Sequence, residues 1–314
     1  MSLLRQQDGN GAGMPVSGLL RPAGQARFAT LRAIMALILR EMATSYGRSP
    51  GGYLWVLLEP LLGITFLVVI FSFGFRTPPL GDNFALFYAT GLLPFSAFNN
   101  LNKRMGSAIG YSRNLLAYPR VSYMDTLIAR LVLTMVTQIT VFVIVLTGIL
   151  LTQETRTVLI IERILLAWTM LTVLGTGVGV LNCFLMTMFP IWNSVWSIAT
   201  TPLLILSGVI LLYENLPEAA QNILWYNPLV HVIGEMRSAF YLGYEANYVS
   251  PAYVFGIGLG LILVGLVFLG RYHRDMLERC APSGDAGRGS YDPEIPVVDD
   301  GSGTERGKEV GLGA

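Results

Sequence analysis

The sequence predicts an all-α integral membrane protein with six transmembrane helices and with both termini on the cytoplasmic side. Two observations lead to this fold class. Of the 314 residues, 53% are apolar and only 13% are charged, whereas a soluble globular protein carries about 25% charged residues. In addition, six separate apolar stretches approach the roughly 20 residues that a helix needs to cross about 30 Å of hydrocarbon.

The six predicted spans are Tyr53–Phe75, Phe84–Leu101, Met124–Leu151, Ile164–Met188, Trp192–Leu212 and Tyr253–Tyr272. If the N-terminus lies inside, the inside segments hold 15 Lys and Arg residues and the outside segments hold 4. Arg130 and Arg271 lie near the inner ends of spans and could snorkel inward. Because Lys and Arg gather on the cytoplasmic side, both termini are predicted to be cytoplasmic.

The membrane domain is expected to cover residues 27–280. Residues 1–26 and 281–314 are predicted to be disordered cytoplasmic tails. The second tail is rich in glycine and acidic residues and lacks an apolar period, so it cannot bury enough surface to offset its ordering entropy.

An amphipathic helix is predicted before the first span. Apolar residues recur at helical spacing from Phe28 to Tyr46, while Arg32 and Arg40 lie on other faces. A basic amphipathic helix beside a span is typical of the membrane interface. The alternative is a helix packed on the base of the bundle, and both can hold together.

Two connections carry more than a simple loop needs. The inside loop Asn102–Tyr123 has four basic residues and an amphipathic stretch, which suggests a short helix that a soluble partner could push. The outer segment 213–252 has two short apolar stretches, 223–226 and 229–241, divided by Asn227 and Pro228. Asn suits a helix N-cap and Pro a first helical position. We expect two short re-entrant helices, which need protein or a water-filled cavity around them.

The sequence shows no catalytic or metal-binding constellation. The only Gly-Lys pair, Gly307-Lys308, is followed by Glu309, so there is no phosphate-binding loop and no ATPase site in this chain. His231 and Glu235 are four residues apart on one helix face, near Arg237. A hydrogen-bonded, charge-paired brace is favoured there over metal or acid–base chemistry. The net charge of +1 gives no field that points to nucleic acid.

Glu59 lies about 9 Å into the first span at 1.5 Å per residue. A carboxylate at that depth is a functional candidate; the alternative is a group near the inner headgroups, paired with Arg48, Lys103 or Arg104. Aromatic residues cluster at span ends, where an interfacial belt is the ordinary explanation, although a minority could stack on sugar rings. Small faces for close helix packing, within the chain or between copies, are predicted at Gly175, Gly177, Gly179, Gly256 and Gly260.

This layout and several short motifs resemble the ABC-2 type permeases, and among them the capsular polysaccharide exporter permeases. The resemblance covers about residues 27–275. Its motifs are Ser45-Tyr46-Gly47-Arg48-Ser49, Gly52-Tyr53-Leu54-Trp55, Glu59-Pro60-Leu61, Gly91-Leu92-Leu93-Pro94-Phe95, Asn114-Leu115-Leu116 with Tyr118-Pro119, and Asn227-Pro228-Leu229-Val230-His231 with Glu235, Arg237 and Phe240. The loose entry Pro50-Gly51-Gly52 departs from the pattern and leaves the start of the first helix open.

The resemblance implies a bacterial inner-membrane permease that works as a homodimer with two copies of a separate ATPase subunit. That subunit would bind ATP and Mg, and this chain would hold no cofactor. The cargo would be a lipid-linked polysaccharide, handed on to periplasmic export components, and nucleic acid would not be a partner.

The resemblance also implies roles for particular residues. Coupling to the ATPase would involve Arg40, Tyr46, Lys103, Arg104, Asn114, Leu115 and Leu116. The substrate path would be lined by Arg48, Tyr53, Trp55, Glu59, Phe95 and Phe98. The outer gate would comprise Tyr226, Asn227, Pro228, His231, Glu235 and Arg237.

Two other functions remain open. One is an ABC-2 exporter of O-antigen, a teichoic-acid-like polymer, a drug or another lipid cargo. The other is a membrane-embedded lipid-processing enzyme, which would require catalytic residues clustered at one membrane depth, and no such cluster is evident in the sequence.

Overall fold

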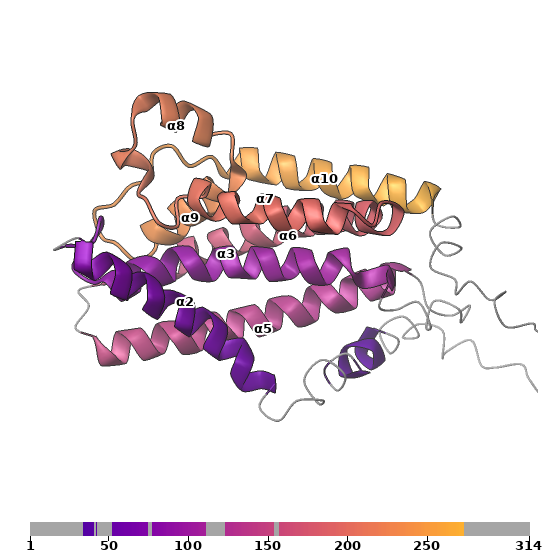
Figure 1. Cartoon of the computed structure of the whole chain (residues 1–314), viewed down its shortest axis with the longest axis horizontal. Coiled ribbons are helices and arrows are strands. Elements are labelled where there is room, and N and C mark those ends of the chain that lie inside the picture. Colours follow the sequence, from indigo (N-terminus) through magenta and orange to yellow (C-terminus); the bar gives the residue numbers. More distant parts are fainter. Residues whose placement is uncertain are drawn as a thin grey trace, which may run out of the picture. The chain divides into compact units, whose positions relative to one another are not determined.

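The computed structural model describes residues 34–40, 42, 52–74, 77–110, 123–153 and 157–272. Within these ranges the regular elements are all helical, as the fold class predicts. A short helical segment at residues 34–40 precedes α2. The labelled elements (Figure 1) are α2 (Gly52–Gly74), α3 (Phe84–Gly106), α5 (Tyr123–Thr152), α6 (Ile161–Met188), α7 (Trp192–Leu206), the 3-10 turn η2 (Tyr213–Asn215), α8 (Glu218–Leu224), α9 (Pro228–Ser238) and α10 (Pro251–Arg271).

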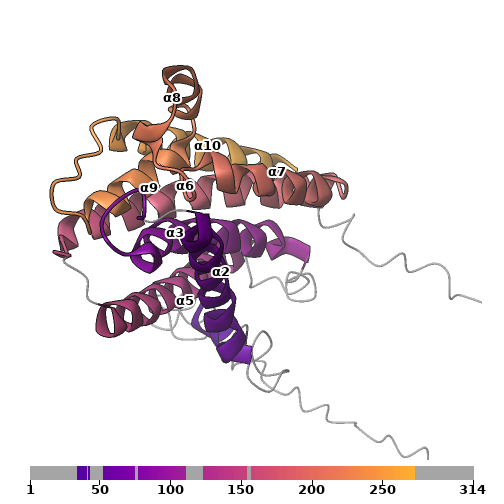
Figure 2. The ribbon, with the colours of Figure 1, turned by 60° about the vertical axis from the view of Figure 1, so that its left-hand side comes forward.

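Helix α3 is the centre of the bundle. It packs against α2, α5, α6 and α9, and its residues 86–95 are buried without interruption. Its first turn is capped by the Asn83 side chain, which accepts hydrogen bonds from the backbone N–H groups of Ala85 and Leu86. The ribbon views show α3 between α5 on one side and α6 and α9 on the other (Figures 1 and 2), so most of its surface is covered by protein.

Among the residues that the structure describes, four helices are long and apolar enough to cross a membrane: Leu54–Phe73 of α2, α5, α6 and α10. The other two predicted spans differ from these. Helix α3 has 23 residues, but Asn99, Asn102 and Lys103 lower the hydropathy of its second half. Helix α7 has 15 residues, about 22 Å at 1.5 Å per residue. The predicted end of that span at Leu212 is wrong, because the helix stops at Leu206 and Gly208 follows with a φ of +80°.

Glycines bring α6 close to its neighbours on two sides. A Cβ atom at Gly175 would lie 2.7 Å from Leu101 of α3, and one at Gly177 would lie 2.5 Å from the Gly258 carbonyl oxygen of α10. Gly179, against Met105, completes the predicted set on α6. On α10 the prediction is not met within this chain, because Gly256 and Gly260 face open space. The adjacent face of α10, which includes Gly258, makes the contact instead.

The segment 213–252 contains two short helices of unequal burial. In α9 the residues 229–238 are all buried, whereas α8 has no buried residue and stands apart from the bundle (Figures 1 and 2). The predicted break is confirmed: Asn227 caps α9 by accepting the N–H of Leu229, and Pro228 is its first residue. The predicted first helix is displaced, because Trp225 and Tyr226 form the turn that follows α8.

Candidate functional site

The two ends of the bundle carry different chemistry. At one end, called here the basic end, α3, α6 and α10 finish and α5 begins. At the opposite end lies the α9 junction, defined as Trp225, His231, Arg237, Tyr248 and Tyr253. Most of the predicted gate residues belong to or border the α9 junction, and the described coupling residues Lys103 and Arg104 lie at the basic end.

The three polar residues predicted as a brace on α9 point to three different partners. Residues 235 and 237 are two positions apart, which is about 200° around a helix of 3.6 residues per turn. Arg163 on α6 is the charge that acts on Glu235. Arg237 instead lies against α3 and the turn after α7. The side chains of Glu235 and Arg237 therefore leave the helix on opposite sides, and the charge that acts on Glu235 belongs to α6 and not to α9.

His231 ties the break before α9 to the start of α10. Its ring is fully buried, its Nε2 atom lies 2.8 Å from the Trp225 carbonyl oxygen, and its Nδ1 atom accepts the N–H of Ser250 at 3.2 Å. These partners assign the proton to Nε2, so the ring is neutral. Burial lowers the pKa of His231 below its ordinary value, against two weaker backbone contributions that raise it. The predicted hydrogen-bonded brace is thus present at His231.

Arg237 joins three elements. Its guanidinium donates to the Val209 carbonyl oxygen at 2.9 Å and lies 4.1 Å from the centroid of the Phe87 ring, a cation–π geometry. A Cβ atom at Gly91 would come within 3.2 Å of the same guanidinium. It would also lie 3.2 Å from the Cα atom of Val209, so a larger residue at this position of the Gly91–Phe95 motif would require Arg237 or the turn at Val209 to shift by a few tenths of an ångström.

Aromatic rings surround His231. The Trp225 ring lies 5.3 Å from the His231 ring and 5.0 Å from that of Tyr253. The Tyr253 hydroxyl donates to the Tyr226 carbonyl oxygen at 2.8 Å, and the Trp225 indole N–H donates to the Tyr248 carbonyl oxygen at 3.2 Å. Tyr248 and Tyr253 were absent from the predicted gate. Their only sequence signal is the high aromatic content of residues 213–253.

A buried cation at the basic end was also missed. Arg130 on α5 is only 3% exposed and donates to the Arg104 carbonyl oxygen and to the Ser107 hydroxyl at the end of α3. The expectation that Arg130 snorkels is wrong, because the freed carbonyls at the end of α3 offer it a partner inside the protein. Lys103 is exposed and Arg104 half-buried beside it.

Several predicted coupling residues lie outside the described ranges. These are Tyr46, Asn114, Leu115 and Leu116, together with Arg48 of the predicted path. Arg40 is described and exposed on the helical segment 34–40.

The predicted path residues do not share one surface of the chain. Trp55, which is 66% exposed, and Glu59 lie on one exposed face of α2. Phe95 and Phe98 are buried in α3, where Phe98 packs beside the position of Gly175. Tyr53 is helical, but its side chain is not among those described. Within the described ranges no three His, Cys, Asp or Glu side chains gather as a metal site.

The structure is that of a multi-pass helical membrane protein. Its long apolar helices lead to the buried helix α9 at one end of the bundle and to the basic end at the other. The chain belongs to the ABC-2 type transporter family, whose model matches residues 32–241. This family supplies the membrane subunit of exporters rather than the ATPase, so the chain is not itself the catalytic subunit.

Its relatives include a polysialic acid transport protein and two capsule polysaccharide export inner-membrane proteins. The chain is 30% identical to the polysialic acid transport protein KpsM of Escherichia coli over 74% of its own length and 90% of the relative. It is 28% identical to the capsule polysaccharide export inner-membrane protein CtrC of Neisseria meningitidis serogroup A, and 29% identical to BexB of Haemophilus influenzae, which carries the same description. Each of these two alignments covers 77% of this chain and 92% of the relative.

Proposed function

We propose that this chain is the permease subunit of an ABC exporter that moves a lipid-linked capsular polysaccharide across the inner membrane. The observation that carries the proposal is the similarity to KpsM, CtrC and BexB, each covered over at least nine tenths of its length. The proposed complex contains two permease copies and two copies of a separate ATPase subunit that binds ATP and Mg. Polymer leaving the complex passes to periplasmic components.

The proposed topology has six crossings with both termini in the cytoplasm. The four apolar helices are joined by α3, which crosses inside the bundle, and by α7 with the turn that follows it. In this topology the basic end faces the cytoplasm and the ATPase, and the α9 junction faces the periplasm. The distribution of Lys and Arg along the sequence supports this orientation.

The exposed face of α2 is an argument for contact with a second copy of the chain. Along it Trp55, Leu62, Phe66 and Phe73 recur at helical spacing, and the carboxylate of Glu59 interrupts this apolar row. An ionised carboxylate facing hydrocarbon is costly. We place this face of α2 against the partner copy or the polysaccharide path, where Glu59 and Trp55 meet water or sugar hydroxyls.

Gene deletion in the source organism tests the cargo. Loss of the chain is expected to remove capsule from the cell surface while polymer accumulates inside, and re-expression is expected to restore surface polymer. Both quantities are measured by extracting surface and intracellular polysaccharide separately. A normal capsule with loss of O-antigen or another surface polymer would instead support the alternative ABC-2 exporter.

A further inference from the structure

Three helices meet in a polar contact near the basic end. The indole N–H of Trp192, the first residue of α7, donates to the Asn182 Oδ1 atom of α6 at 3.0 Å. On α3, a Cβ atom at Gly106 would lie 3.7 Å from the Asn182 Cβ atom. Gly106, Asn182 and Trp192 therefore mark one level at which α3, α6 and α7 come together.

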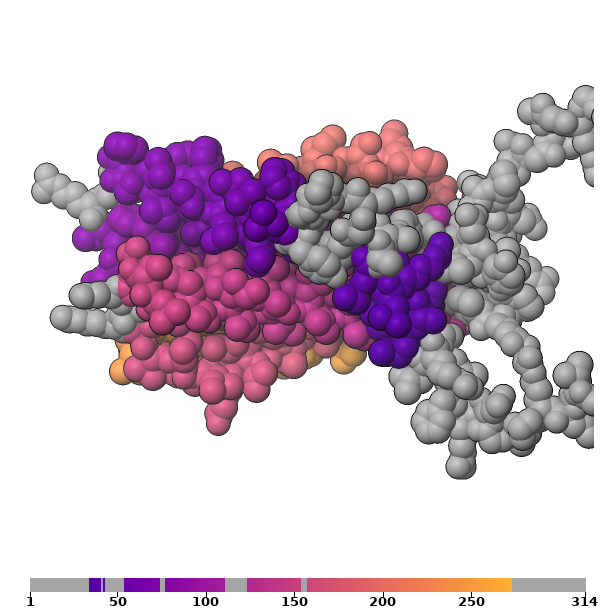
Figure 3. Space-filling model, turned by 90° about the horizontal axis from the view of Figure 1, so that it is seen from below, coloured from indigo at the N-terminus to yellow at the C-terminus, as the bar shows by residue number. Residues whose placement is uncertain are grey.

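The directions of these helices decide which residues share the next level. Helices α3 and α6 run in the same direction, because Leu101 meets the position of Gly175 and Met105 meets that of Gly179. Helix α7 runs the other way, since its last residue, Leu206, accepts a hydrogen bond from the side chain that caps α9. In the space-filling view α7, in salmon, lies along the edge of the bundle (Figure 3).

One turn away from the basic end, the facing positions are polar. A turn of about 3.6 residues leads from Gly106 to Asn102 on α3. The same step leads from Trp192 to Trp196 on α7, and Asn99 lies one further turn along α3. Asn102 is fully buried and Trp196 is partly buried against the core. Asn102 and Trp196 are therefore at the same level, next to the contact between the three helices.

Four polar atoms around this level are shielded from solvent and have no hydrogen-bond partner among the described residues. They are Oδ1 of Asn99, Oδ1 of Asn102, Nδ2 of Asn182 and Nε1 of Trp196. Other hydrogen bonds fix the amides of Asn102 and Asn182: Asn102 donates through Nδ2 to a carbonyl of its own helix, and Asn182 accepts through Oδ1 from Trp192. The set therefore offers two acceptors and two donors.

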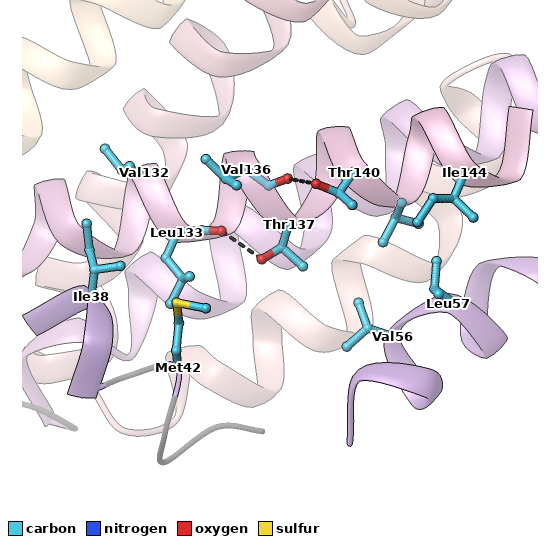
Figure 4. Close-up of a pocket in the computed structure, with 11 residues that line it drawn as sticks. Ile38, Met42, Val56, Leu57, Val132, Leu133, Val136, Thr137, Thr140 and Ile144 are labelled. Carbon is cyan, nitrogen blue, oxygen red and sulfur yellow. Dashed lines mark hydrogen bonds between the residues drawn. The ribbon is translucent and has the colours of Figure 1, made fainter. Parts of the chain in front are cut away.

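Threonines of α5 show how a hydroxyl in this bundle is satisfied without a ligand. Thr137 donates to the Leu133 carbonyl oxygen and Thr140 donates to the Val136 carbonyl oxygen, both at 2.8 Å (Figure 4). The Trp196 indole N–H is too far from its own backbone to bond in this way. A buried donor or acceptor that lacks a partner is destabilising, so four of them within about two turns indicate a bound polar molecule.

We propose that Asn99, Asn102, Asn182 and Trp196 hold an internal water site between α3, α6 and α7. The four groups are uncharged, and a water molecule can donate two hydrogen bonds and accept two, which matches the set. Buried waters typically make about three hydrogen bonds to groups of this kind. Lys103, next to Asn102 in sequence, is exposed at the basic end, so water reaches the site from that side.

The site adds a polar attachment to a helix that has little apolar burial of its own. Thr200 is the one residue of α7 that is buried. Through the water, the Trp196 N–H is joined to the asparagines of α3 and α6, one turn beyond the direct bond of Trp192 to Asn182. This inference does not depend on the cargo of the transporter.

X-ray hydroxyl-radical labelling of the full-length chain in lipid nanodiscs, read by mass spectrometry, tests the proposal. A bound water yields radicals that oxidise the side chains beside it. Met105 is 1% exposed and lies three positions from Asn102, whereas Met170 and Met236 are 0% exposed and lie away from the site. We expect Met105 to be oxidised several-fold faster than Met170 and Met236. Equal rates for the three methionines would overturn the proposal, and so would a direct bond from Trp196 to Asn102 that leaves Met105 unlabelled.

Asn102→Leu and Trp196→Phe remove one acceptor and one donor, and each is expected to lower the oxidation rate of Met105 several-fold. Thr90→Val is the matched control on α3, because Thr90 is fully buried and its hydroxyl already donates to the Phe87 carbonyl oxygen at 2.9 Å. It is expected to leave Met105 oxidation unchanged. Two independent variants keep the test valid if one of them fails to fold. Oxidation of Met105 at the wild-type rate in a folded Asn102→Leu or Trp196→Phe protein would overturn the proposal.

Discussion

Two buried guanidinium groups hold helix ends in place. Arg130 donates to the Arg104 carbonyl oxygen near the end of α3, and Arg237 donates to the Val209 carbonyl oxygen shortly after the end of α7. The last carbonyls of a helix have no partner within the helix and carry partial negative charge. In a bundle that excludes water, a buried Arg satisfies such a carbonyl directly, as Arg130 does at Arg104, and Arg237 does the same for the turn carbonyl of Val209. Each Arg thereby ties the end of one helix to the side of another.

His231 makes the stability of the α9 junction dependent on pH. Because burial lowers its pKa in the folded protein, the unfolded chain binds a proton more readily below its ordinary value of about 6.5. Its contribution to stability is therefore present above that pH and is lost as the pH falls. We expect the midpoint of thermal unfolding of the wild-type protein in detergent to be lower at pH 5.5 than at pH 7.5.

His231→Gln is the comparison for this prediction, because glutamine does not titrate in that range. The variant is expected to be less stable at pH 7.5, by about 1 kcal/mol for each hydrogen bond lost, and to show a smaller loss between the two pH values. An identical pH dependence in both proteins would mean that other groups cause it.

At the scale of elements, the position of α3 explains why it does not resemble a membrane span. Its second half carries Asn99, Asn102, Lys103 and Arg104, and it is enclosed by α2, α5, α6 and α9. Asn102 donates to the Phe98 carbonyl oxygen at 2.8 Å, so part of its polarity is satisfied within the helix. A helix that is screened from lipid by its neighbours does not need the hydropathy of one that faces hydrocarbon.

The contact of α6 with α10 is sensitive to a single methyl group. Gly177→Ala places a Cβ atom 2.5 Å from a backbone oxygen of Gly258, where no flexible side chain can yield. Overpacking of this kind costs about 1–3 kcal/mol, more than the ~1 kcal/mol that Ala gains over Gly in a helix. We expect a clearly lower midpoint of thermal unfolding in detergent and a smaller monodisperse fraction after heating.

Gly256→Ala is the matched control on α10, because a Cβ atom there meets nothing within 4 Å. Its unfolding midpoint is expected to equal or slightly exceed that of wild type. A Gly177→Ala protein as stable as Gly256→Ala would show that α6 and α10 do not approach this closely. If Gly256→Ala impaired only the assembly of two copies, that glycine would belong to the interface between copies.

At the scale of the whole molecule, the proposed ATPase subunits act on the basic end. The α9 junction lies at the opposite end of the same helices. Helices α3 and α6 join the two: α3 runs from Phe87 beside Arg237 to Arg104 beside Arg130, and α6 packs on both α3 and α9. Helices α3 and α6 therefore form a continuous packed connection between the basic end and the α9 junction, along which movement of the proposed ATPase subunits would be passed.

Replacing Leu115 and Leu116 with Asp tests the coupling role predicted for the inside loop Asn102–Tyr123. We expect normal membrane insertion, with loss of ATPase stimulation and of polymer export, because two charges disrupt an apolar contact with the partner subunit. Copurification of the ATPase subunit and ATP hydrolysis by the complex are the measurements. Val158→Asp with Leu159→Asp changes an exposed apolar pair at the opposite end of the bundle and is expected to preserve copurification. Unchanged copurification and export in the first variant would remove the loop from coupling.

The sequence by itself determined the class of protein, the family and several local features. Low charge and long apolar runs require a membrane, and the motifs from Gly91 to Arg237 indicate an ABC-2 permease. The cap at Asn227 and the helix that begins at Pro228 follow from the backbone preferences of those two residues. These properties depend on residue type and on neighbours a few positions away, which a sequence displays directly.

Only the tertiary structure decided which way each helix faces. It brought the guanidinium of Arg237 to Phe87 and the Val209 carbonyl oxygen, buried Arg130 against the end of α3, and chose Gly258 instead of Gly256 for contact with α6. A change of one or two positions turns a side chain by 100° or 200° around a helix. The rotation is set by packing between residues far apart in the chain, and lipid and protein interior are equally apolar surroundings, so hydropathy does not distinguish them.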